Sequence, residues 1–448
     1  MEIDSLAEPM EIEDFKEIFD NRVSQNIKDR IEYKRQLLLE LQLDETRTNH
    51  CMRLYKYDEN NKPIYRIGNK IILNERIRVD NGIGSNNLNS LIYKASIRLK
   101  ITERPFQFLV KITKLDDLIE KEIKILEILT NALQENKCPH FPIIYSILKC
   151  NNFLNFNELS RTRSNSNSFA SRGYNDINTY PIYMRQNREN ELISILTETT
   201  NGNLNMFINE FYNNSQLLEN AIAQIYFALM FFYSETKMYH CNSIGENFYY
   251  HKIKPGGYFH YRIFGINYYI ENLGYLWVIT DFKFSISLND TDIKSKLLTM
   301  RGDFEKIILD SFTNFTDSEQ ESNGSYFTFK KNFNDDFKEK IMNIYYNLFR
   351  DKKKYGQDNL NVFLTALLKE LFKCKIILTN KKLYTKINYN TVKILNKEPY
   401  IIYYFTEFQK PLEKIYKDYE TVVKFITKHK GTGIRRGGAV KKILKSYK

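Results

Sequence analysis

Residues 221–250 read AIAQIYFALMFFYSETKMYHCNSIGENFYY and join a long apolar run to a polar loop. The run Ala221–Tyr233 is too long for an ordinary strand and predicts a buried helix. The loop after it contains His240 and Asn247, seven residues apart. This spacing after a buried helix makes the loop the first candidate for a functional site.

The composition is that of a globular protein. Of the 448 residues, 42% are hydrophobic, which is enough for a sizeable core in one large domain or in a few smaller ones. Much of the net charge of +12 lies at the C-terminus, because residues 428–448 contain eight basic and no acidic residues. Such a segment is most often a solvated terminus, and less often an arm that binds nucleic acid, an acidic protein or a membrane surface.

Cysteine spacing and apolar patterning favour an intracellular protein. No two cysteines have CxxC spacing, which argues against a zinc ribbon and a disulfide framework; they are Cys51, Cys138, Cys150, Cys241 and Cys374. Residues 1–15 are acidic and lack the apolar core of a signal peptide. The longest apolar run is too short to span a bilayer and is interrupted by Gln224. We therefore expect a soluble protein in a reducing compartment, with no membrane span.

The first part of the chain predicts a helical extension and then an antiparallel sheet. Apolar residues recur at helical spacing over residues 12–43. Short β-rich runs separated by turn residues follow, at 66–73, 90–99 and 106–112. Residues 115–133 have helical periodicity and end before a proline-containing stop. Residues 151–190 are polar, rich in Ser, Asn and Arg, and predict an insertion within the sheet region.

The second part of the chain is mostly helical in pattern. Helical periodicity recurs at 304–312, 338–349 and 361–372, after the run that begins at Ala221. A sheet-rich part followed by a helix-rich part predicts an α+β protein with two lobes. The expected regions are an extension at 1–60, a first lobe at 61–200, a second lobe at 201–427 and a basic tail at 428–448.

A glycine pair lies between two strand-like runs. Gly82 and Gly84 are expected in a turn, where backbone N–H groups can approach phosphate oxygens without a side chain in the way. The alternative is an ordinary hairpin turn. A third glycine is missing, since Asn87 occupies the place where it would stand.

A lysine and a glutamate follow at positions suited to phosphate binding. Lys111 lies near the end of an apolar strand, where a lysine is usually solvated but can also neutralise phosphates if a carboxylate holds it. Glu122 lies on the same side of the next helix as several apolar residues. Glu120 and Glu127 are rivals, because the sequence does not fix the rotation of that helix, and a solvated helix face is the commoner fate of a glutamate.

Further polar residues end the buried segments of the second half. Thr197 and Glu198 close an apolar strand before a short linker, as a hinge between two lobes requires. Asn247 and Asp281 are oxygen donors that suit Mg²⁺, although each alone is more often a turn residue. Asp303 is expected to be a plain N-cap of the helix that follows it.

In this order the motifs resemble those of the protein kinase family, over about Asn81–Asp310. The matching residues are Gly82 and Gly84 (glycine-rich loop), Lys111 (strand lysine), Glu122 (helix glutamate), Thr197 and Glu198 (hinge at the adenine pocket), His240–Asn247 (catalytic loop) and Asp281 with Phe282 (D-F-G start). The resemblance implies a bilobal kinase-like fold that binds ATP and Mg²⁺ and acts on protein serine or threonine. The Tyr-rich segment 256–282 also resembles serine/threonine kinase-like proteins of large nucleocytoplasmic DNA viruses, which implies a host cytoplasm or virion location.

Three departures from the kinase pattern bear on activity. The aspartate that accepts the substrate proton is replaced by Asn242, the lysine two residues later by Ile244, and the glycine after Phe282 by Lys283. A positioned general base is worth about 10²- to 10⁴-fold in rate, so we expect weak or no phosphate transfer. The alternative is a pseudokinase that acts as a scaffold or virion component through protein partners, while the basic tail is a candidate contact for nucleic acid or another acidic surface.

Overall fold

The protein contains both helices and sheets, so the α+β class expected from the sequence is confirmed. The computed structural model describes residues 27–41, 66–67, 70–73, 77–83, 90–97, 106–150, 192–287, 293–314, 328–350, 360–379, 393–396 and 398–403. The chain divides into two compact units: unit 1 takes residues up to Asn201 together with His251–Lys254, and unit 2 takes the others. Residues 12–26, the polar insertion at 151–190 and the basic tail at 428–448 lie outside the described residues.

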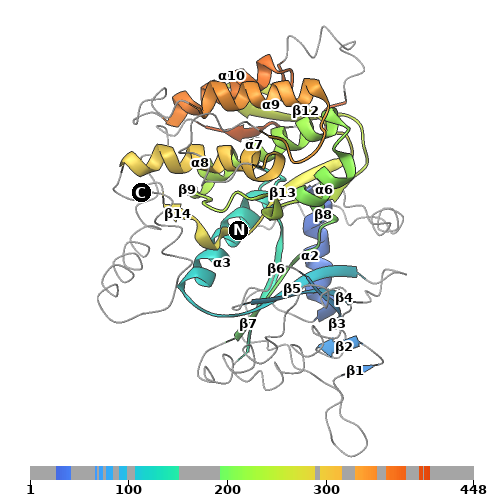
Figure 1. The fold of residues 1–448 in the computed structure, drawn as a ribbon. Coiled ribbons are helices and arrows are strands. Elements are labelled where there is room, and N and C mark those ends of the chain that lie inside the picture. The colour runs from blue at the N-terminus through green and yellow to red at the C-terminus, as the bar shows by residue number, and fades with distance from the viewer. Residues whose placement is uncertain are drawn as a thin grey trace, which may run out of the picture. The chain divides into compact units, whose positions relative to one another are not determined.

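Unit 1 is built on a seven-stranded sheet in which every neighbouring pair of strands is antiparallel (Figure 1). In spatial order the strands are β1 (Arg66–Ile67), β2 (Lys70–Leu73), β3 (Ile77–Ile83), β4 (Ser90–Ile97), β5 (Phe106–Lys114), β7 (Leu192–Glu198) and β6 (Ile144–Cys150). In β5, Phe106, Phe108 and Val110 are buried while Gln107 is exposed. This alternation is expected of a strand with one face against the core.

Two details of this sheet differ from the sequence expectation. Gly82 lies inside β3, paired with Tyr93 of β4, and not in the turn after it. The pattern missed β3 because Asp80, Asn81 and Gly82, near its end, are residue types that are depleted in strands. Gly84 lies outside the described residues, and the single run expected at 66–73 is divided into β1 and β2.

Helix α3 (Asp117–Gln134) follows β5 and agrees with the helix expected over 115–133. Its first turn is capped by Asp116, whose Oδ1 accepts a hydrogen bond from the backbone N–H of Ile119 at 3.0 Å. Apolar residues that recur at helical spacing bury one side of α3; they include Ile119, Ile125, Leu126, Leu129 and Leu133. The rotation of α3 is therefore set by its packing within unit 1.

Helix α2 (Ile27–Leu41) packs against β6 and α3, and a buried arginine fixes it there. The Arg30 side chain is 0% exposed and makes a two-pronged ion pair with Glu198, at 2.9 and 2.7 Å. It also donates to the carbonyl oxygens of Pro139 and Phe141, at 2.6 and 2.7 Å. Burial by itself would raise the pKa of Glu198, but the charges of Arg30 and then of His251 hold that pKa far below its ordinary value.

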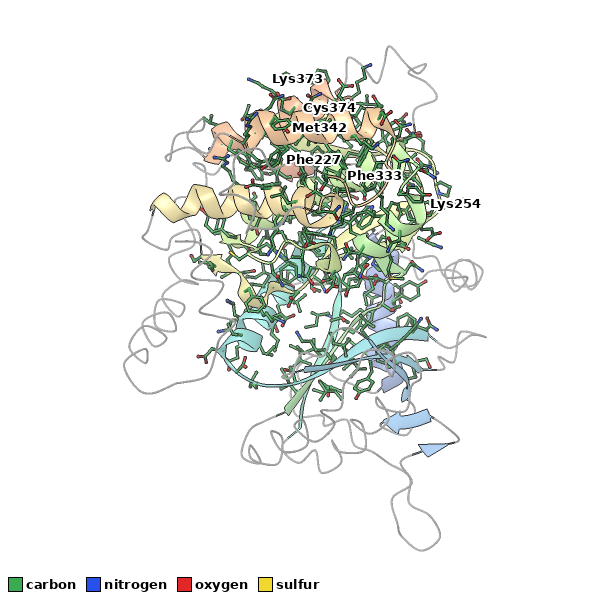
Figure 2. The ribbon with its side chains drawn as sticks, viewed as in Figure 1. Phe227, Lys254, Phe333, Met342, Lys373 and Cys374 are labelled. Carbon is green, nitrogen blue, oxygen red and sulfur yellow. The ribbon has the colours of Figure 1, made fainter. Side chains whose placement is uncertain are left out.

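Unit 2 is organised around the predicted apolar helix. Helix α7 (Ser215–Thr236) extends the run Ala221–Tyr233 by several residues at its start and is buried on nearly all sides, with Phe227 in the interior (Figure 2). The other α-helices among the described residues of this unit are α6 (Leu204–Phe211), α8 (Ile293–Phe312), α9 (Asp335–Leu348) and α10 (Leu360–Lys373). A helix that is apolar on every side must pack against other elements on every side, and several elements of this unit contact α7.

The described residues of unit 2 also form small sheets, one of which includes β10, whose last two residues belong to unit 1. Strands β11 (Tyr258–Ile263) and β12 (Ile266–Glu271) form a hairpin within the Tyr-rich segment, flanked by β16 (Tyr400–Ile402) and β15 (Leu378–Thr379). The hairpin turn is Phe264–Gly265, and φ is positive at both residues, as a two-residue turn favours. The remaining sheets are β13 (Tyr275–Ile279), β10 (Phe248–Lys252) and β8 (Gly202–Asn203), and β14 (Ile286–Ser287) with β9 (Met238–Tyr239).

Among the described residues, α7 is the one helix that is long and apolar enough to cross a membrane. Most of this helix is buried inside the protein, and core helices of soluble proteins have the same length and composition. It is therefore weak evidence for a membrane span.

The Arg30 cluster yields a stability prediction. Replacing Arg30→Met leaves the Glu198 carboxylate buried without its main partner, so the free energy of unfolding is expected to fall by about 3–5 kcal/mol in urea denaturation. Arg35→Met is the matched control on the same helix. Its ion pair with Glu32 is solvent-exposed on the arginine side, and its loss is expected to cost less than about 1 kcal/mol. Equal losses for the two variants would contradict a structural role for the Arg30 pair.

Candidate active site

A lysine and a glutamate form a close ion pair in unit 1. Lys111, on β5, places its Nζ 2.6 Å from Oε2 of Glu122, on α3. The two side chains are only 15% and 7% exposed. The rivals Glu120 and Glu127 are both exposed. The rotation of α3, which the sequence left open, thus turns Glu122 toward Lys111.

The pair has a local physical cause. Glu122 lies on the apolar side of α3, three residues before Ile125 and four before Leu126. A carboxylate on a buried helix face needs a charged or hydrogen-bonding partner. Lys111 supplies it from the neighbouring strand, in a register that places it opposite Ile92 of β4 and Ile195 of β7.

The two expected hinge residues have different surroundings. Thr197 is half-buried in β7 and pairs with Leu109 and Ile144. The Glu198 carboxylate is bound by Arg30 and also accepts the backbone N–H of Ile143 at 3.4 Å. The Glu198 side chain therefore has a structural role in unit 1, which the sequence did not indicate. The expectation that both residues border an adenine pocket stays a prediction.

In unit 2, the loop after α7 begins with a buried histidine. His240 is completely buried, and this burial lowers its pKa below the ordinary value, although Asp303 opposes the shift. In the neutral ring, Nε2–H donates to the carbonyl oxygen of Thr280 at 2.9 Å, and Nδ1 accepts the backbone N–H of Asn242 at 3.3 Å. The ring of Phe282 lies against His240 at a centroid distance of 5.5 Å. His240 thus ties the loop to the segment after β13.

Asp303 holds the same loop from the interior of α8. Its Oδ2 accepts the backbone N–H groups of His240 and Cys241, at 2.9 and 3.1 Å, and the hydroxyl of Tyr233 at 2.9 Å. Its Oδ1 accepts the hydroxyl of Ser243 at 2.9 Å. The expectation of an N-cap was wrong, because α8 begins ten residues earlier at Ile293 and Asp303 is only 3% exposed. Nothing in RGDFEKI indicates partners some 60 residues away.

Three predicted site residues meet in this loop. The side-chain amide of Asn242 donates to Oδ2 of Asp281 at 2.6 Å, and the side-chain amide of Asn247 donates to the carbonyl oxygen of Asn242 at 2.8 Å. Asp281 has φ 64° and ψ 63°, in the left-handed region. Non-glycine residues rarely adopt it, and such strain gathers at functional sites. The left-handed backbone therefore marks Asp281 as a candidate functional residue.

The third departure from the kinase pattern also contacts this carboxylate. Lys283 lies in a short 3₁₀ turn, Phe282–Phe284, and its φ is not positive, so a residue other than glycine can adopt this conformation. Its Nζ is 3.3 Å from Oδ1 of Asp281. The replacement of glycine by lysine therefore adds a cation beside the expected metal ligand without straining the turn.

The donor types of Asn247 and Asp281 fit Mg²⁺, which prefers oxygen ligands and keeps several waters. Both oxygens of Asp281, however, already have a partner: Oδ2 accepts a hydrogen bond from the Asn242 amide, and Oδ1 forms an ion pair with Lys283. Within the described residues there is no cluster of three or more His, Cys, Asp or Glu side chains that would hold a metal by themselves. A bound Mg²⁺ would thus rely on few protein ligands and would have to displace the Lys283 ammonium.

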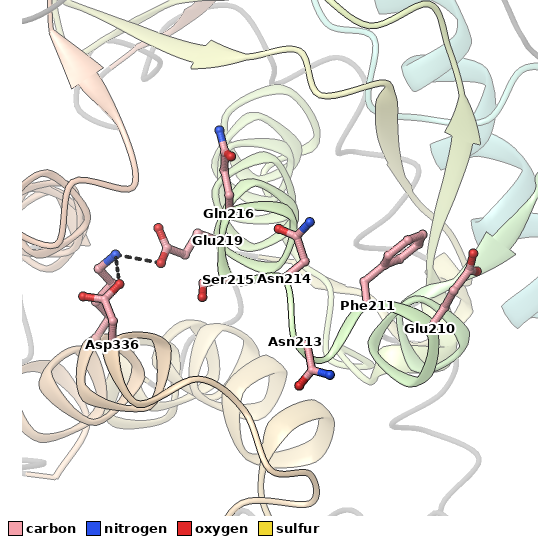
Figure 3. A pocket seen from close by; sticks show the side chains of 9 residues that line it. Glu210, Phe211, Asn213, Asn214, Ser215, Gln216, Glu219 and Asp336 are labelled. Atoms are coloured by element: carbon pink, nitrogen blue, oxygen red, sulfur yellow. Dashed lines mark hydrogen bonds and ion pairs between the residues drawn. The ribbon is translucent and has the colours of Figure 1, made fainter.

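An open pocket of about 500 Å³ lies in unit 2 between the start of α7 and α9 (Figure 3). Lys340 bridges Glu219 and Asp336 across it, at 2.7 Å to each. Burial raises the pKa of Glu219, and Lys340 opposes this shift. None of the residues that line the pocket belongs to the predicted site, and Lys340 is paired with two of its carboxylates, Glu219 and Asp336.

Asp303 yields a testable prediction. Asp303→Asn keeps the shape of the side chain but removes the charge that four hydrogen-bond donors face, so the free energy of unfolding is expected to fall by about 1.5–3 kcal/mol. Urea denaturation followed by tryptophan fluorescence measures the change. Asp335→Asn, at an almost fully exposed carboxylate, is the control and is expected to stay within about 0.5 kcal/mol of the unaltered protein. An Asp303→Asn variant as stable as that control would contradict the role given to Asp303.

No protein-family model and no curated protein matches this sequence. A functional assignment therefore rests on the side chains themselves. Those that carry it are Lys111 with Glu122 in unit 1, and Asn242, Asn247 and Asp281 in unit 2.

Proposed function

We propose that this protein is a protein-kinase-like nucleotide-binding protein in which phosphate transfer is slow or lost. The observation that carries the proposal is the ion pair between Lys111 and Glu122. In protein kinases a strand lysine binds the nucleotide phosphates and is held by a glutamate of the following helix, and this pair must be in place for activity. Here the lysine lies on β5 and the glutamate on α3, the next helix along the chain.

The finer fold assignment belongs to the same proposal. Unit 1 is rich in strands and unit 2 in helices, in agreement with the two lobes that the kinase resemblance implies. The Tyr-rich segment forms the hairpin β11–β12 and strand β13, and it supports the proposed likeness to kinase-like proteins of large DNA viruses. A host-cell or virion location follows from that likeness.

The candidate residues of unit 2 have two proposed roles, metal binding and phosphate transfer. Asn247 and Asp281 would hold Mg²⁺, which neutralises nucleotide phosphates when it is bound. Asn242 stands where the general base is expected, but its amide is neutral and is engaged with Asp281. Loss of a general base lowers the rate by about 10²- to 10⁴-fold. Any transfer would therefore be slow, with ATP as donor and a protein hydroxyl as acceptor.

A scaffold without turnover is the second candidate. It is favoured by the same contact, because Asn242 and Asp281 satisfy each other and leave no carboxylate at the position of the base. In that case the protein would act through protein partners, with nucleotide as a structural ligand.

Nucleotide binding tests the proposal directly. The full-length protein is expected to bind a fluorescent ATP analogue, and Lys111→Met is expected to weaken binding about 10- to 100-fold, the value of a charge-assisted hydrogen bond. Lys124→Met, at an exposed position of α3, is the control and should bind as the unaltered protein does. Undetectable binding by the unaltered protein, or equal binding by Lys111→Met, would refute the proposal.

Asn242→Asp separates slow transfer from a scaffold. With ATP, Mg²⁺ and casein, the variant is expected to transfer phosphate about 10²- to 10⁴-fold faster than the unaltered protein, because the general base is restored. Asn242→Ala removes the amide without supplying a base and should show no gain. If Asn242→Asp binds nucleotide yet transfers no phosphate, the scaffold is the correct reading.

A further inference from the structure

We propose that the Lys283 ammonium is a tethered counter-ion of Asp281 that takes the place of a divalent cation, so that this protein binds nucleotide with little dependence on Mg²⁺. The proposal rests on the nucleotide-binding function proposed above and refines its cofactor requirement. It concerns a residue for which the kinase resemblance supplies no role, since glycine is expected at that position.

The contacts of Asp281 are the first argument. Lys283 Nζ is 3.3 Å from Oδ1, and Asn242 Nδ2 is 2.6 Å from Oδ2. Each oxygen of the carboxylate therefore has a partner in this chain, an ion-paired ammonium on Oδ1 and a hydrogen-bonded amide on Oδ2. A metal ion that enters must break an ion pair and a short hydrogen bond, and both losses subtract from its affinity.

The charge of the loop is the second argument. Around the Asp281 carboxylate, Lys283 cancels its charge, and Asn242 and Asn247 are neutral; Glu246 of the same loop is negative but exposed. Coulomb attraction scales with the product of the charges, so a divalent cation at Asp281 gains little from these four side chains, whose charges sum to zero. An aspartate in place of Asn242 would have left a net negative charge for the metal to neutralise.

The rigidity of the turn is the third argument. Phe282 is completely buried and stacks on Phe232 of α7 at 5.2 Å, and the backbone N–H of Ser285 donates to the carbonyl oxygen of Phe282 at 3.0 Å. Lys283 projects from this fixed turn, and its Nζ also lies 5.0 Å from the centre of the Phe284 ring. With 16% of its side chain exposed, it is held next to Asp281 rather than extended into solvent.

The same ammonium suits the chemistry of the ligand. A lysine is a point charge with three N–H donors that binds phosphate oxygens well. Beside Asp281 it can offer donors to a nucleotide phosphate while it neutralises the carboxylate. We therefore expect ATP itself, without a metal, to be a competent ligand.

The experiment measures the dissociation constant for ATP in EDTA and at several millimolar Mg²⁺. For the unaltered protein the two constants are expected to agree within about threefold, whereas Lys283→Met should bind at least tenfold more weakly in EDTA and recover with Mg²⁺. Lys283→Arg keeps the charge and should behave as the unaltered protein. Lys331→Met, at an exposed lysine, controls for the loss of one positive charge.

A second measurement needs no nucleotide. Mn²⁺, a spectroscopic substitute for Mg²⁺, is expected to bind Lys283→Met at least tenfold more tightly than the unaltered protein, as measured by paramagnetic resonance. If the unaltered protein binds Mn²⁺ as tightly as Lys283→Met, or if its ATP affinity rises more than tenfold on addition of Mg²⁺, the proposal is overturned. Failure of ATP binding under every condition would refute the nucleotide function instead, and the Mn²⁺ comparison would still decide the role of Lys283.

Discussion

The buried carboxylate of Asp303 is the constraint on which the functional loop of unit 2 depends. It lies in the interior of α8 and accepts hydrogen bonds from two backbone N–H groups of the loop, from Ser243 and from Tyr233 of α7. A charge removed from water requires such partners, and with four donors the geometry has little freedom. The position of His240 and the path of the chain toward Asn242 follow from this arrangement. The conformation of this candidate loop is therefore held in large part by a residue some 60 positions further along the chain.

Near this loop, the negative charge of Asp281 is balanced by side chains of the same protein. The Asn242 amide donates a hydrogen bond to the Asp281 carboxylate, and the Lys283 ammonium forms an ion pair with it. Asn242 and Lys283 are two departures from the kinase pattern, and both contact the same carboxylate. A neutral amide at 242 and an ammonium at 283 leave less negative charge there than the kinase pattern would, which is what the proposed independence of Mg²⁺ requires. Asp281 itself has a left-handed backbone conformation.

Unit 1 shows a similar use of buried charge for positioning. Lys111 and Glu122 tie β5 to α3, and Arg30 and Glu198 tie α2 to the end of β7. Each pair joins segments that are separate in the sequence, the second across 168 residues. Paired and hydrogen-bonded charges of this kind specify one arrangement of elements more than they add net stability, because desolvation offsets much of their attraction. The ion pair consequently fixes the Lys111 side chain on β5 against Glu122 of α3.

The sequence by itself determined the regular elements and the order of the chemical groups. Apolar periodicity predicted α3 and α7, and the spacing from His240 to Asn247 singled out the loop, because these signals depend on neighbours within a few residues. Only the tertiary structure decided that Glu122 is the carboxylate that forms an ion pair with Lys111. It also decided that Asp303 binds the loop instead of capping a helix, and that Glu198 is paired with Arg30. Periodicity tells which face of a helix is buried but not which distant residue lies opposite. Partners of that kind are chosen by packing and by the requirement that every buried charge be satisfied.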